Sequence, residues 1–325
     1  MSMYRYQTLT RHIIMAGLIL FGAPLYGQSY PSKPIRMVAP TAGGGIDFIA
    51  RVIAPFLTAN IGQQIVIDNR GGAGGLIAVE TVIRSKPDGY TLLCYGPPAW
   101  INPLLKKSVS YDPIKDLVPV GLITRTANLL VVHPSLPVKS VKELIALAKM
   151  RPGQLLDAGS DTGSSAHLAA ELFKSMAGVS IIRVPYKGVG AGIGALISGE
   201  VQVMIPAISA AMPHVKSGRL RALGVSTAGP TRLAPGVPAI AASGLPGYVV
   251  ESQNAIFAPA DTPAAVIALL NQELNRVLKN PDVRERLLVG GTEPTGGSSQ
   301  LALETIKADM AKWAKVIKDL GIRED

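Results

Sequence analysis

Three glycine-rich loops are the features of this 325-residue chain whose residue types could do chemistry. The stretch "DNRGGAGGLIAVETV" (68–82) leaves a strand-like run, passes through four glycines and enters a helical pattern at once. "RMVAPTAGGGIDFIARVI" (36–53) repeats this arrangement, and "GSDTGSS" (159–165) is a third loop of the kind. The N-terminus of a helix presents unpaired backbone N–H groups, and glycine lets an anion approach them closely. The loops therefore predict anion binding, with tight turns that bind no ligand as the alternative.

Nucleotide-binding and catalytic patterns do not fit these loops. No G-x-x-x-x-G-K-[ST] occurs, and "GAGIGA" (190–195) lies too far beyond its strand for a dinucleotide fingerprint. "DTGSS" (161–165) lacks the second D-T/S-G motif of an aspartic protease, and a helical pattern follows it. Ser160 or Ser164 with His167 is an alternative nucleophile and base, but no G-x-S-x-G elbow exists. The histidines have no metal-ligand spacing, so we expect no enzyme, metal or cofactor.

Composition and the N-terminus describe an exported globular protein. Hydrophobic residues make up 48% of the chain and charged residues 17%, which favours a well-buried core. Residues 1–29 resemble a signal peptide, because two arginines precede the apolar run 13–21 and Gly27-x-Ser29 fits a cleavage site. The run is too short to span a membrane. We expect a soluble periplasmic protein, with a cytosolic N-terminal helix as the alternative.

The net charge bears on nucleic-acid binding, and the single cysteine bears on disulfide formation. The net charge is +10, but the basic residues are scattered and aromatic residues make up only 5%. This distribution is not typical of nucleic-acid binding, so no nucleic-acid partner is expected. Cys94 cannot form an internal disulfide, and we expect it to be a small buried hydrophobe rather than a nucleophile.

Short apolar runs alternate with helical patterns along most of the chain. This alternation predicts an α/β protein with mostly parallel sheets. The predicted strands are 35–39, 64–68, 91–95, 117–124, 129–133, 155–159, 181–184, 201–205 and 222–226. The predicted helices are 47–60, 77–86, 141–150, 165–177, 190–198 and 210–217, followed by a helical C-terminal quarter that ends in 300–320.

So many strands require two sheets, and hence two lobes. "LVPVGLITRTANLLVVHP" (117–134) is an extended run that can leave the first lobe, and "LRALGVST" (220–227) is a candidate return. We predict one lobe from residues 30–126 with 227–325 and a second lobe from 127–226, joined by two strands. A cleft between two lobes is a usual ligand site, and two connecting strands allow the lobes to close on a ligand.

Ten segments carry a resemblance to a known family when they are taken in order. They are "YPSKPIRMVAP", "GGGIDFIAR", "IDNRGGAGG", "PDGYTLL", "YDPIKDLVPVGLI", "GSSAHLAAELF", "VPYKG", "VKSGRLRALGVST", "APADTP" and "KWAKVIKDLGI". The chain resembles the Bug family, the substrate-binding proteins of tripartite tricarboxylate transporters, from about Tyr30 to Ile322. The resemblance implies a type II periplasmic binding protein fold, a small organic acid in the cleft and delivery to a membrane permease. Some relatives are thought to act as sensors, so a sensor kinase is the alternative partner.

The resemblance also implies ligand contacts from both lobes of a monomer. From the first lobe these are Thr41, Gly44, Gly45, Asp47, Gly72, Ala73, Gly74, Gly75 and Pro98, and from the second Ser160, Thr162, Gly163, Ser164, Tyr186, Lys187 and Gly188. The third loop of the first lobe would be Tyr95 to Asn102. Asp47 would begin the helix that faces the ligand. Lys187 is the one cation in a loop of this kind, and a solvated lysine is the equal alternative.

Departures from the family pattern concern the ligand. The usual loop P-F-x-P-G-G-S-T-D is here "PTAGGGID", one residue shorter and without the aromatic residue, and Ile46 replaces a hydroxyl residue. Leu76 and Ala78 replace the asparagine and glycine of the second loop, and Pro206 replaces a polar residue. Fewer side-chain donors favour a larger or more apolar acid than aspartate. Trp100 is a candidate wall of the site, with a core position as the alternative.

The composition of "GGAGG" suggests how the acid is held. We expect backbone N–H groups, not side chains, to bind one end of it. A Cβ at Gly72 or Gly74 would obstruct that approach or require an unfavourable φ. The alternative is that these glycines serve the turn alone.

Overall fold

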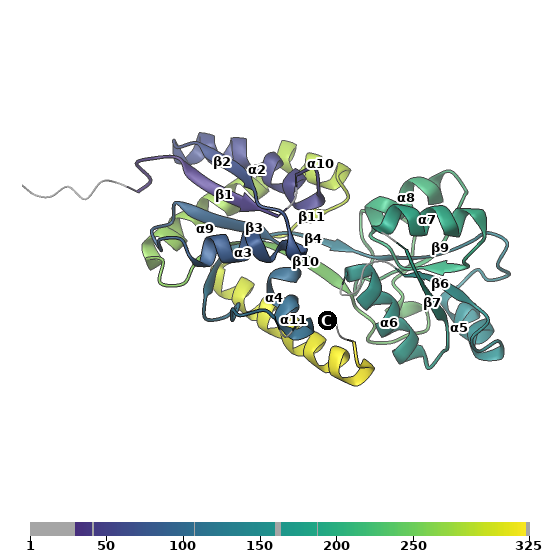
Figure 1. Cartoon of the computed structure of the whole chain (residues 1–325). Coiled ribbons are helices and arrows are strands. Elements are labelled where there is room, and N and C mark those ends of the chain that lie inside the picture. The colour runs from purple at the N-terminus through teal and green to yellow at the C-terminus, as the bar shows by residue number, and fades with distance from the viewer. Residues whose placement is uncertain (1–29, 41, 107, 160–163, 187, 323–325) are drawn as a thin grey trace, which may run out of the picture. The chain divides into compact units, whose positions relative to one another are not determined.

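The computed structural model describes residues 30–40, 42–106, 108–159, 164–186 and 188–322, shown in Figure 1. The predicted signal peptide, 1–29, lies outside the described residues. The described residues from Lys33 onward form one compact unit. Among the helices of the described part, none combines the length and the apolar character needed to cross a membrane.

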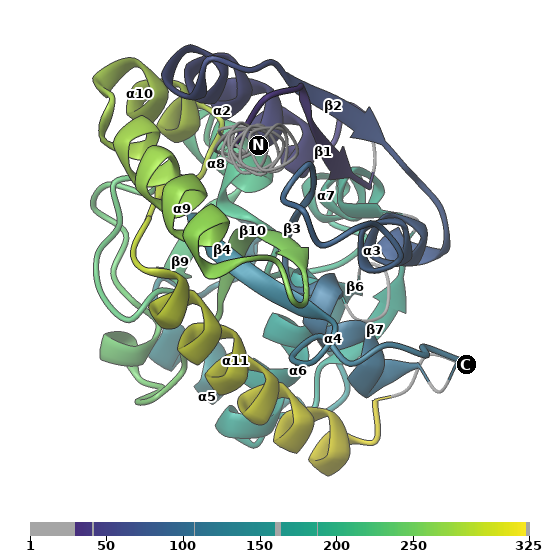
Figure 2. The ribbon, with the colours of Figure 1, turned by 90° about the vertical axis from the view of Figure 1, so that its left-hand side faces the viewer.

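The first sheet has six strands. In sheet order they are β11 (Glu293–Pro294), β4 (Leu117–Ala127), β10 (Glu251–Pro259), β3 (Thr91–Tyr95), β1 (Ile35–Ala39) and β2 (Ile65–Asn69). β1 is parallel to both β2 and β3, whereas β10 runs antiparallel to β3 and β4, and β11 antiparallel to β4. α2 (Gly45–Ile61), α9 (Ala264–Lys279) and α10 (Pro281–Val289) lie on one side of this sheet. α3 (Leu76–Ile83), α4 (Pro98–Leu105) and α11 (Ser299–Leu320) lie on the other (Figure 2).

The second sheet has five strands. In sheet order they are β7 (Ile182–Pro185), β6 (Leu156–Gly159), β8 (Val203–Met204), β5 (Leu129–Val132) and β9 (Arg221–Val225). β6 is parallel to β7 and β8, while β5 is antiparallel to β8 and β9. Both sheets are therefore mixed rather than mostly parallel. The parallel pairs belong to strand–helix–strand units. All five antiparallel strand pairs involve β4, β5 or β10, which flank the passages between the sheets.

Ten α-helices lie between these strands in the described residues. They are α2 (Gly45–Ile61), α3 (Leu76–Ile83), α4 (Pro98–Leu105), α5 (Val141–Met150), α6 (Ser165–Ala177), α7 (Gly188–Ser198), α8 (Ile208–Lys216), α9 (Ala264–Lys279), α10 (Pro281–Val289) and α11 (Ser299–Leu320). α4 was not expected from the sequence, because two prolines occur within its eight residues. Pro98 suits a first helical position, where its missing N–H would have no partner within the helix.

The chain passes between the sheets in two different ways. β4 and β5 are separated by Asn128 alone, as the extended run 117–134 predicts. Asn128 is buried, and its side-chain amide donates to the Ile205 carbonyl at 2.9 Å. β9, the candidate return strand, lies wholly in the second sheet. The chain returns instead through residues 226–250 to β10.

β10 was missed because its first half is polar. Glu251, Ser252, Gln253 and Asn254 do not form an apolar run. In the structure the Asn254 side-chain amide donates to the Thr124 hydroxyl of β4 at 2.9 Å. A buried polar pair of this kind satisfies both groups and allows a polar sequence to occupy the interior of a sheet.

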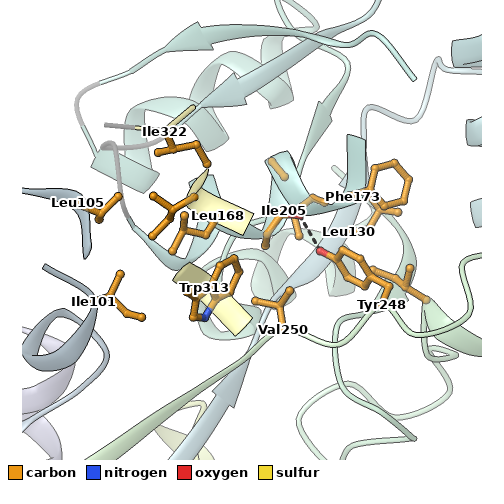
Figure 3. Packing of buried hydrophobic residues seen from close by; sticks show 14 of the residues in the cluster. Ile101, Leu105, Leu130, Leu168, Phe173, Ile205, Tyr248, Val250, Trp313 and Ile322 are labelled. Atoms are coloured by element: carbon orange, nitrogen blue, oxygen red, sulfur yellow. Dashed lines mark hydrogen bonds between the residues drawn. The ribbon is translucent and has the colours of Figure 1, made fainter. Parts of the chain in front are cut away.

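The return segment ends against helices of the second sheet. Tyr248 is fully buried, its hydroxyl donates to the Ala169 carbonyl at 2.9 Å, and its ring meets Phe173 edge-on at 6.0 Å. Figure 3 shows these rings beside Leu130 and Val250. Residues near 248, which the sequence analysis groups with the first lobe, thus make these contacts with elements of the second sheet.

The C-terminal helix closes the same apolar cluster. Trp313 of α11 belongs to it with Ile101 of α4 and Leu168 of α6 (Figure 3). Trp100 is also a core residue, since it is 1% exposed and its indole N–H donates to Asp309 at 2.8 Å. Cys94 is fully buried, which raises the pKa of its thiol to about 12 and confirms the expected role of a small hydrophobe.

Tyr248 variants test the packing of the return segment. Tyr248→Phe removes one buried hydrogen bond and should lower the free energy of unfolding by about 1 kcal/mol. Tyr248→Ala also removes the ring and should lower it by about 3–5 kcal/mol. Urea unfolding of the two variants and the wild type measures both values. An alanine variant as stable as the phenylalanine variant would contradict the contacts with Phe173.

Candidate functional site

Three strand–helix junctions meet at one edge of the first sheet. β1, β2 and β3 are parallel neighbours, and each is followed by a helix: α2, α3 and α4 respectively. The predicted first-lobe residues in the described part fall on these junctions; they are Gly44, Gly45, Asp47, Gly72, Ala73, Gly74, Gly75 and Pro98. Their convergence directs the positive ends of three helices toward one region, which is suited to an anion.

The second sheet contributes two further junctions. α6 follows β6, and α7 follows the parallel neighbour β7. Ser164 is the N-cap of α6, and its hydroxyl accepts from the His167 N–H at 3.2 Å. Gly188 begins α7 with a φ of 79°. The remaining predicted residues, Thr41, Ser160, Thr162, Gly163 and Lys187, lie outside the described residues.

Tyr186 and His167 have partners within the second lobe. The Tyr186 hydroxyl donates to a Glu200 carboxylate oxygen at 2.7 Å, and this hydrogen bond raises the pKa of the phenol. His167 is 5% exposed, and burial lowers the pKa of its imidazole to about 4. The imidazole is therefore neutral at pH 7 and packs at the start of α6.

The turn at residues 72–75 is left-handed throughout. Gly72, Gly74 and Gly75 have φ values of 118°, 67° and 86°, and Ala73 has a φ of 50°. The Gly75 N–H donates to the Gly72 carbonyl at 2.9 Å and closes the turn immediately before α3. Residues with a Cβ rarely adopt this region, so the backbone itself requires glycine at most of these positions.

Tyr95 lies directly against this turn. Its hydroxyl donates to the Gly74 carbonyl at 2.8 Å, and the side-chain amide of Asn102 donates to the same oxygen at 3.2 Å. Burial raises the pKa of the Tyr95 phenol to about 12, so it remains a donor. A Cβ on Gly75 would lie 2.0 Å from the Tyr95 hydroxyl oxygen. β3 and α4 thus hold the turn from one side, and Gly75 makes that approach possible.

Gly74 differs from the other two glycines. A Cβ there would lie 3.5 Å from Lys106 Nζ and 4.0 Å from Asn102 Nδ2, which is ordinary contact. At Gly72 the Cβ would meet Ile77 Cδ1 at 2.6 Å. The positive φ values therefore account for glycine at 72, 74 and 75, and at 72 and 75 a Cβ would also collide with a neighbouring side chain. Binding of a ligand by its N–H groups stays a prediction.

The buried carboxylate of Asp47 fixes the first loop through hydrogen bonds. It is 4% exposed; Oδ2 accepts from the Gly43 N–H and from Arg51 Nε, each at 2.9 Å, and Oδ1 accepts from the Asn69 side-chain amide at 3.0 Å. The hydrogen bond from Arg51 lowers the pKa of this carboxyl group to about 2, so it is ionised at neutral pH. Asp47 thus connects the first loop, α2 and the end of β2.

The resemblance placed the loop Tyr95 to Asn102 at the site, but the contacts of Tyr95, Asn102 and Lys106 with the glycine turn were not predicted from the sequence. The sequence feature that could have revealed these contacts is the third strand–helix junction, because a side chain at the end of β3 or on α4 must lie near the loops after β1 and β2. For the described residues, no group of three or more histidine, cysteine or acidic side chains is arranged to hold a metal ion.

Known proteins match this chain over most of its length. The family model described as "Tripartite tricarboxylate transporter family receptor" matches residues 49–322. Protein BugT from Bordetella pertussis is 34% identical over 322 residues, 97% of this chain and 99% of the relative.

Two solved structures add bound carboxylates. The structure "R. palustris Rpa4515 with adipate" is 39% identical with a TM-score of 0.78, and covers 90% of this chain and 99% of its own. MatC from Rhodopseudomonas palustris with bound malate is 29% identical with a TM-score of 0.73, and covers 89% and 100%. These matches confirm the expected resemblance and fold class.

Stability at low pH tests the role of Asp47. Its folded-state pKa of about 2 lies below the ordinary value of 3.8, so its contribution is present above pH 4 and lost as the pH falls toward 2. Asp47→Asn should be less stable than the wild type at pH 5–7, and this difference should shrink toward pH 2. Thermal unfolding of both proteins across this range measures it. A difference that does not change with pH would contradict the assignment.

Gly75→Ala and Gly74→Ala form a matched pair. The first adds left-handed strain and a collision with Tyr95, so the free energy of unfolding should fall by roughly 2–4 kcal/mol. The second adds left-handed strain with ordinary contacts and should cost about 1–2 kcal/mol. Chemical unfolding without ligand compares them. Equal losses would mean that Tyr95 does not constrain residue 75.

Proposed function

Because this chain belongs to the receptor family of tripartite tricarboxylate transporters, we propose that it is a periplasmic solute-binding protein that captures a small organic acid and delivers it to such a transporter. The observation that carries this proposal is that the junctions after the parallel strands β1, β2 and β3 meet at one edge of the first sheet. The junction between β2 and α3 is a left-handed glycine turn. This arrangement supplies backbone N–H groups and helix-end charge to a carboxylate without requiring a cationic side chain.

The ligand proposed is an acid with an apolar body and a carboxylate at its end. Ile46 and Leu76, which replace polar residues of the usual family loops, are partly buried and pack against the apolar core cluster. The polar contacts of the first lobe are then left mainly to the backbone. A relative 39% identical to this chain was solved with adipate, whose two carboxylates are joined by four methylene groups.

The remaining parts of the proposal concern processing and assembly. Residues 1–29 serve as a signal peptide, and the exported chain is a monomer without catalytic activity. Its second lobe extends from Ala127 to about Val250, because the end of the return segment contacts α6. The lobes close on the ligand about the two passages between the sheets. The further expected ligand contacts, from Thr41, Ser160, Thr162, Gly163 and Lys187, belong to the same site.

Thermal-shift screening tests the ligand class. The panel contains malate, adipate and other dicarboxylates of about four to eight carbons, with adipamide as a neutral control for adipate. A ligand at 100 times its Kd should stabilise the protein by about 2.7 kcal/mol and raise its Tm by several degrees. Adipamide should give no shift. The proposal fails if neutral or cationic compounds raise Tm and no acid does.

A sensor role, in which the liganded protein docks on a sensor kinase instead of a permease, is the second candidate. Genes adjacent to the coding sequence separate these outputs. Two adjacent membrane-subunit genes would support transport, whereas an adjacent two-component pair with no transporter genes would support sensing.

A further inference from the structure

Two aspartates of this protein are similarly buried, but only one of them has hydrogen-bond donors. Asp47 accepts from three donors in the first lobe. Asp157 of β6 is 2% exposed, and neither of its carboxylate oxygens accepts a hydrogen bond within the described residues. A buried carboxyl group without donors is favoured in its neutral form, because nothing replaces the water that would solvate its charge. Asp157 is therefore placed to hold a proton.

The strand neighbours of Asp157 donate no hydrogen bond to it. Asp157 is in register with Arg183 of β7 on one side and with the apolar Val203 of β8 on the other. A Cβ on Gly159 would lie 2.4 Å from Arg183 Cγ and 2.5 Å from Arg183 Nε. The arginine side chain therefore crosses Gly159 at the end of β6, and it contributes a nearby charge to Asp157 but no hydrogen bond.

The polar groups that approach Asp157 from α6 and the return segment have other partners. Lys174 of α6 donates to Glu171 at 2.5 Å. The Tyr248 hydroxyl donates to a backbone carbonyl of α6 at 2.9 Å. His167, with its pKa lowered to about 4 by burial, is neutral above about pH 5. No group on these two segments therefore compensates a charge on Asp157 through a hydrogen bond.

Desolvation outweighs the surrounding charges in setting the protonation of this carboxyl group. Burial raises the pKa of Asp157 from 3.8 to about 6. The charge of Lys174 lowers this pKa, that of Glu171 raises it, and that of Arg183 lowers it. The proton on Asp157 is therefore exchanged between about pH 5 and pH 7, a range in which the His167 imidazole does not change its charge.

Asp157 lies close to the place where the second lobe is expected to meet its ligand. It precedes the last residue of β6, Gly159, by two positions, so the two Cα atoms are about 7 Å apart. An anion bound at this strand end and at the N-terminus of α6 is then about 10 Å from the Asp157 carboxyl group. At an effective dielectric constant of about 20, a charge on Asp157 weakens binding of this anion by about 10-fold.

We propose that Asp157 is a proton-binding site of the second lobe, and that the bound proton favours capture of an anionic ligand at the adjacent end of β6. The second half of this inference rests on the proposed function. Loss of the proton leaves a charge inside the lobe without a hydrogen-bond donor, which lowers the stability of the lobe and repels the acid. The protein then binds its ligand more tightly in mildly acidic than in alkaline solution.

Urea unfolding of Asp157→Asn and the wild type without ligand, from pH 4 to pH 8, tests the proton site. Because the folded-state pKa is raised, the stability contributed by Asp157 is fully present below pH 4 and is lost as the pH rises through 6. Asparagine is neutral throughout. From pH 4 to pH 7 the unfolding equilibrium constant of the wild type should therefore rise about 10- to 100-fold relative to that of the variant. Asp47→Asn is the control, and it should instead be less stable than the wild type at pH 7.

Calorimetric titration with adipate and with malate tests the coupling to the ligand. At pH 8 Asp157→Asn should bind the preferred acid about 10-fold more tightly than the wild type, because the repelling charge is absent. At pH 5.5 the two affinities should agree within about threefold. Comparing the two proteins at each pH cancels the ionisation of the acid itself. Binding to the wild type at pH 7 should also take up a fraction of a proton, which binding heats in buffers of different ionisation enthalpy measure.

The outcomes separate the proton site, the coupling and the proposed function. A variant that becomes less stable than the wild type as the pH rises would overturn the proton site, since nearby cations would then stabilise the ionised carboxylate. The expected stability with wild-type affinity at pH 8 would overturn the coupling and leave carboxylate binding intact. A wild type that binds neither acid would overturn the proposed function and the coupling, while unfolding still decides the proton site. If the variant does not fold, wild-type binding without proton uptake at pH 7 would overturn the inference.

Discussion

The contact between Tyr95 and the glycine turn is the constraint on which the first lobe's binding edge depends. The hydroxyl at the end of β3 donates to the Gly74 carbonyl, and the lack of a Cβ at Gly75 lets the ring come that close. This single contact fixes the position of the turn after β2 relative to the start of α4. Asp47 fixes the turn after β1 relative to the end of β2, because its carboxylate accepts hydrogen bonds from the Gly43 N–H and the Asn69 side-chain amide. Three loops that are distant in sequence are thereby held in one arrangement before any ligand binds, which reduces the entropy that binding must overcome.

Much of the fold could be predicted from the sequence because its strand–helix units are locally encoded. β1 and β3 begin and end where the apolar runs do, and Gly75 and Leu76 mark the start of α3 as the glycine-to-helix pattern indicates. Elements that depend on distant partners could not be found in this way. β10 has a polar first half that becomes compatible with a sheet interior only beside Thr124, and α4 contains prolines that a local rule counts against a helix.

The site shows the same division between local and distant information. Glycines with left-handed backbone can be recognised from their spacing, and so can the helix starts. The identity of the side chains that contact them cannot, because Tyr95, Asn102 and Lys106 reach the turn only through the parallel register of β1, β2 and β3. Asp47 illustrates the converse, since its position at a helix start suggested a ligand contact, whereas its oxygens accept hydrogen bonds from Gly43, Arg51 and Asn69.

The position of β10 has a consequence for the order in which the molecule can be assembled. β10 lies between β3 and β4 in the first sheet, yet it is made from residues 251–259, after the whole second sheet. A chain emerging from its N-terminus therefore holds β1, β2 and β3 without the neighbour that β3 requires, and it exposes an unpaired strand edge. Since α11 packs on α4 beside Trp100, the apolar core of the first lobe is completed only when the last helix is in place. Such non-local pairing slows folding.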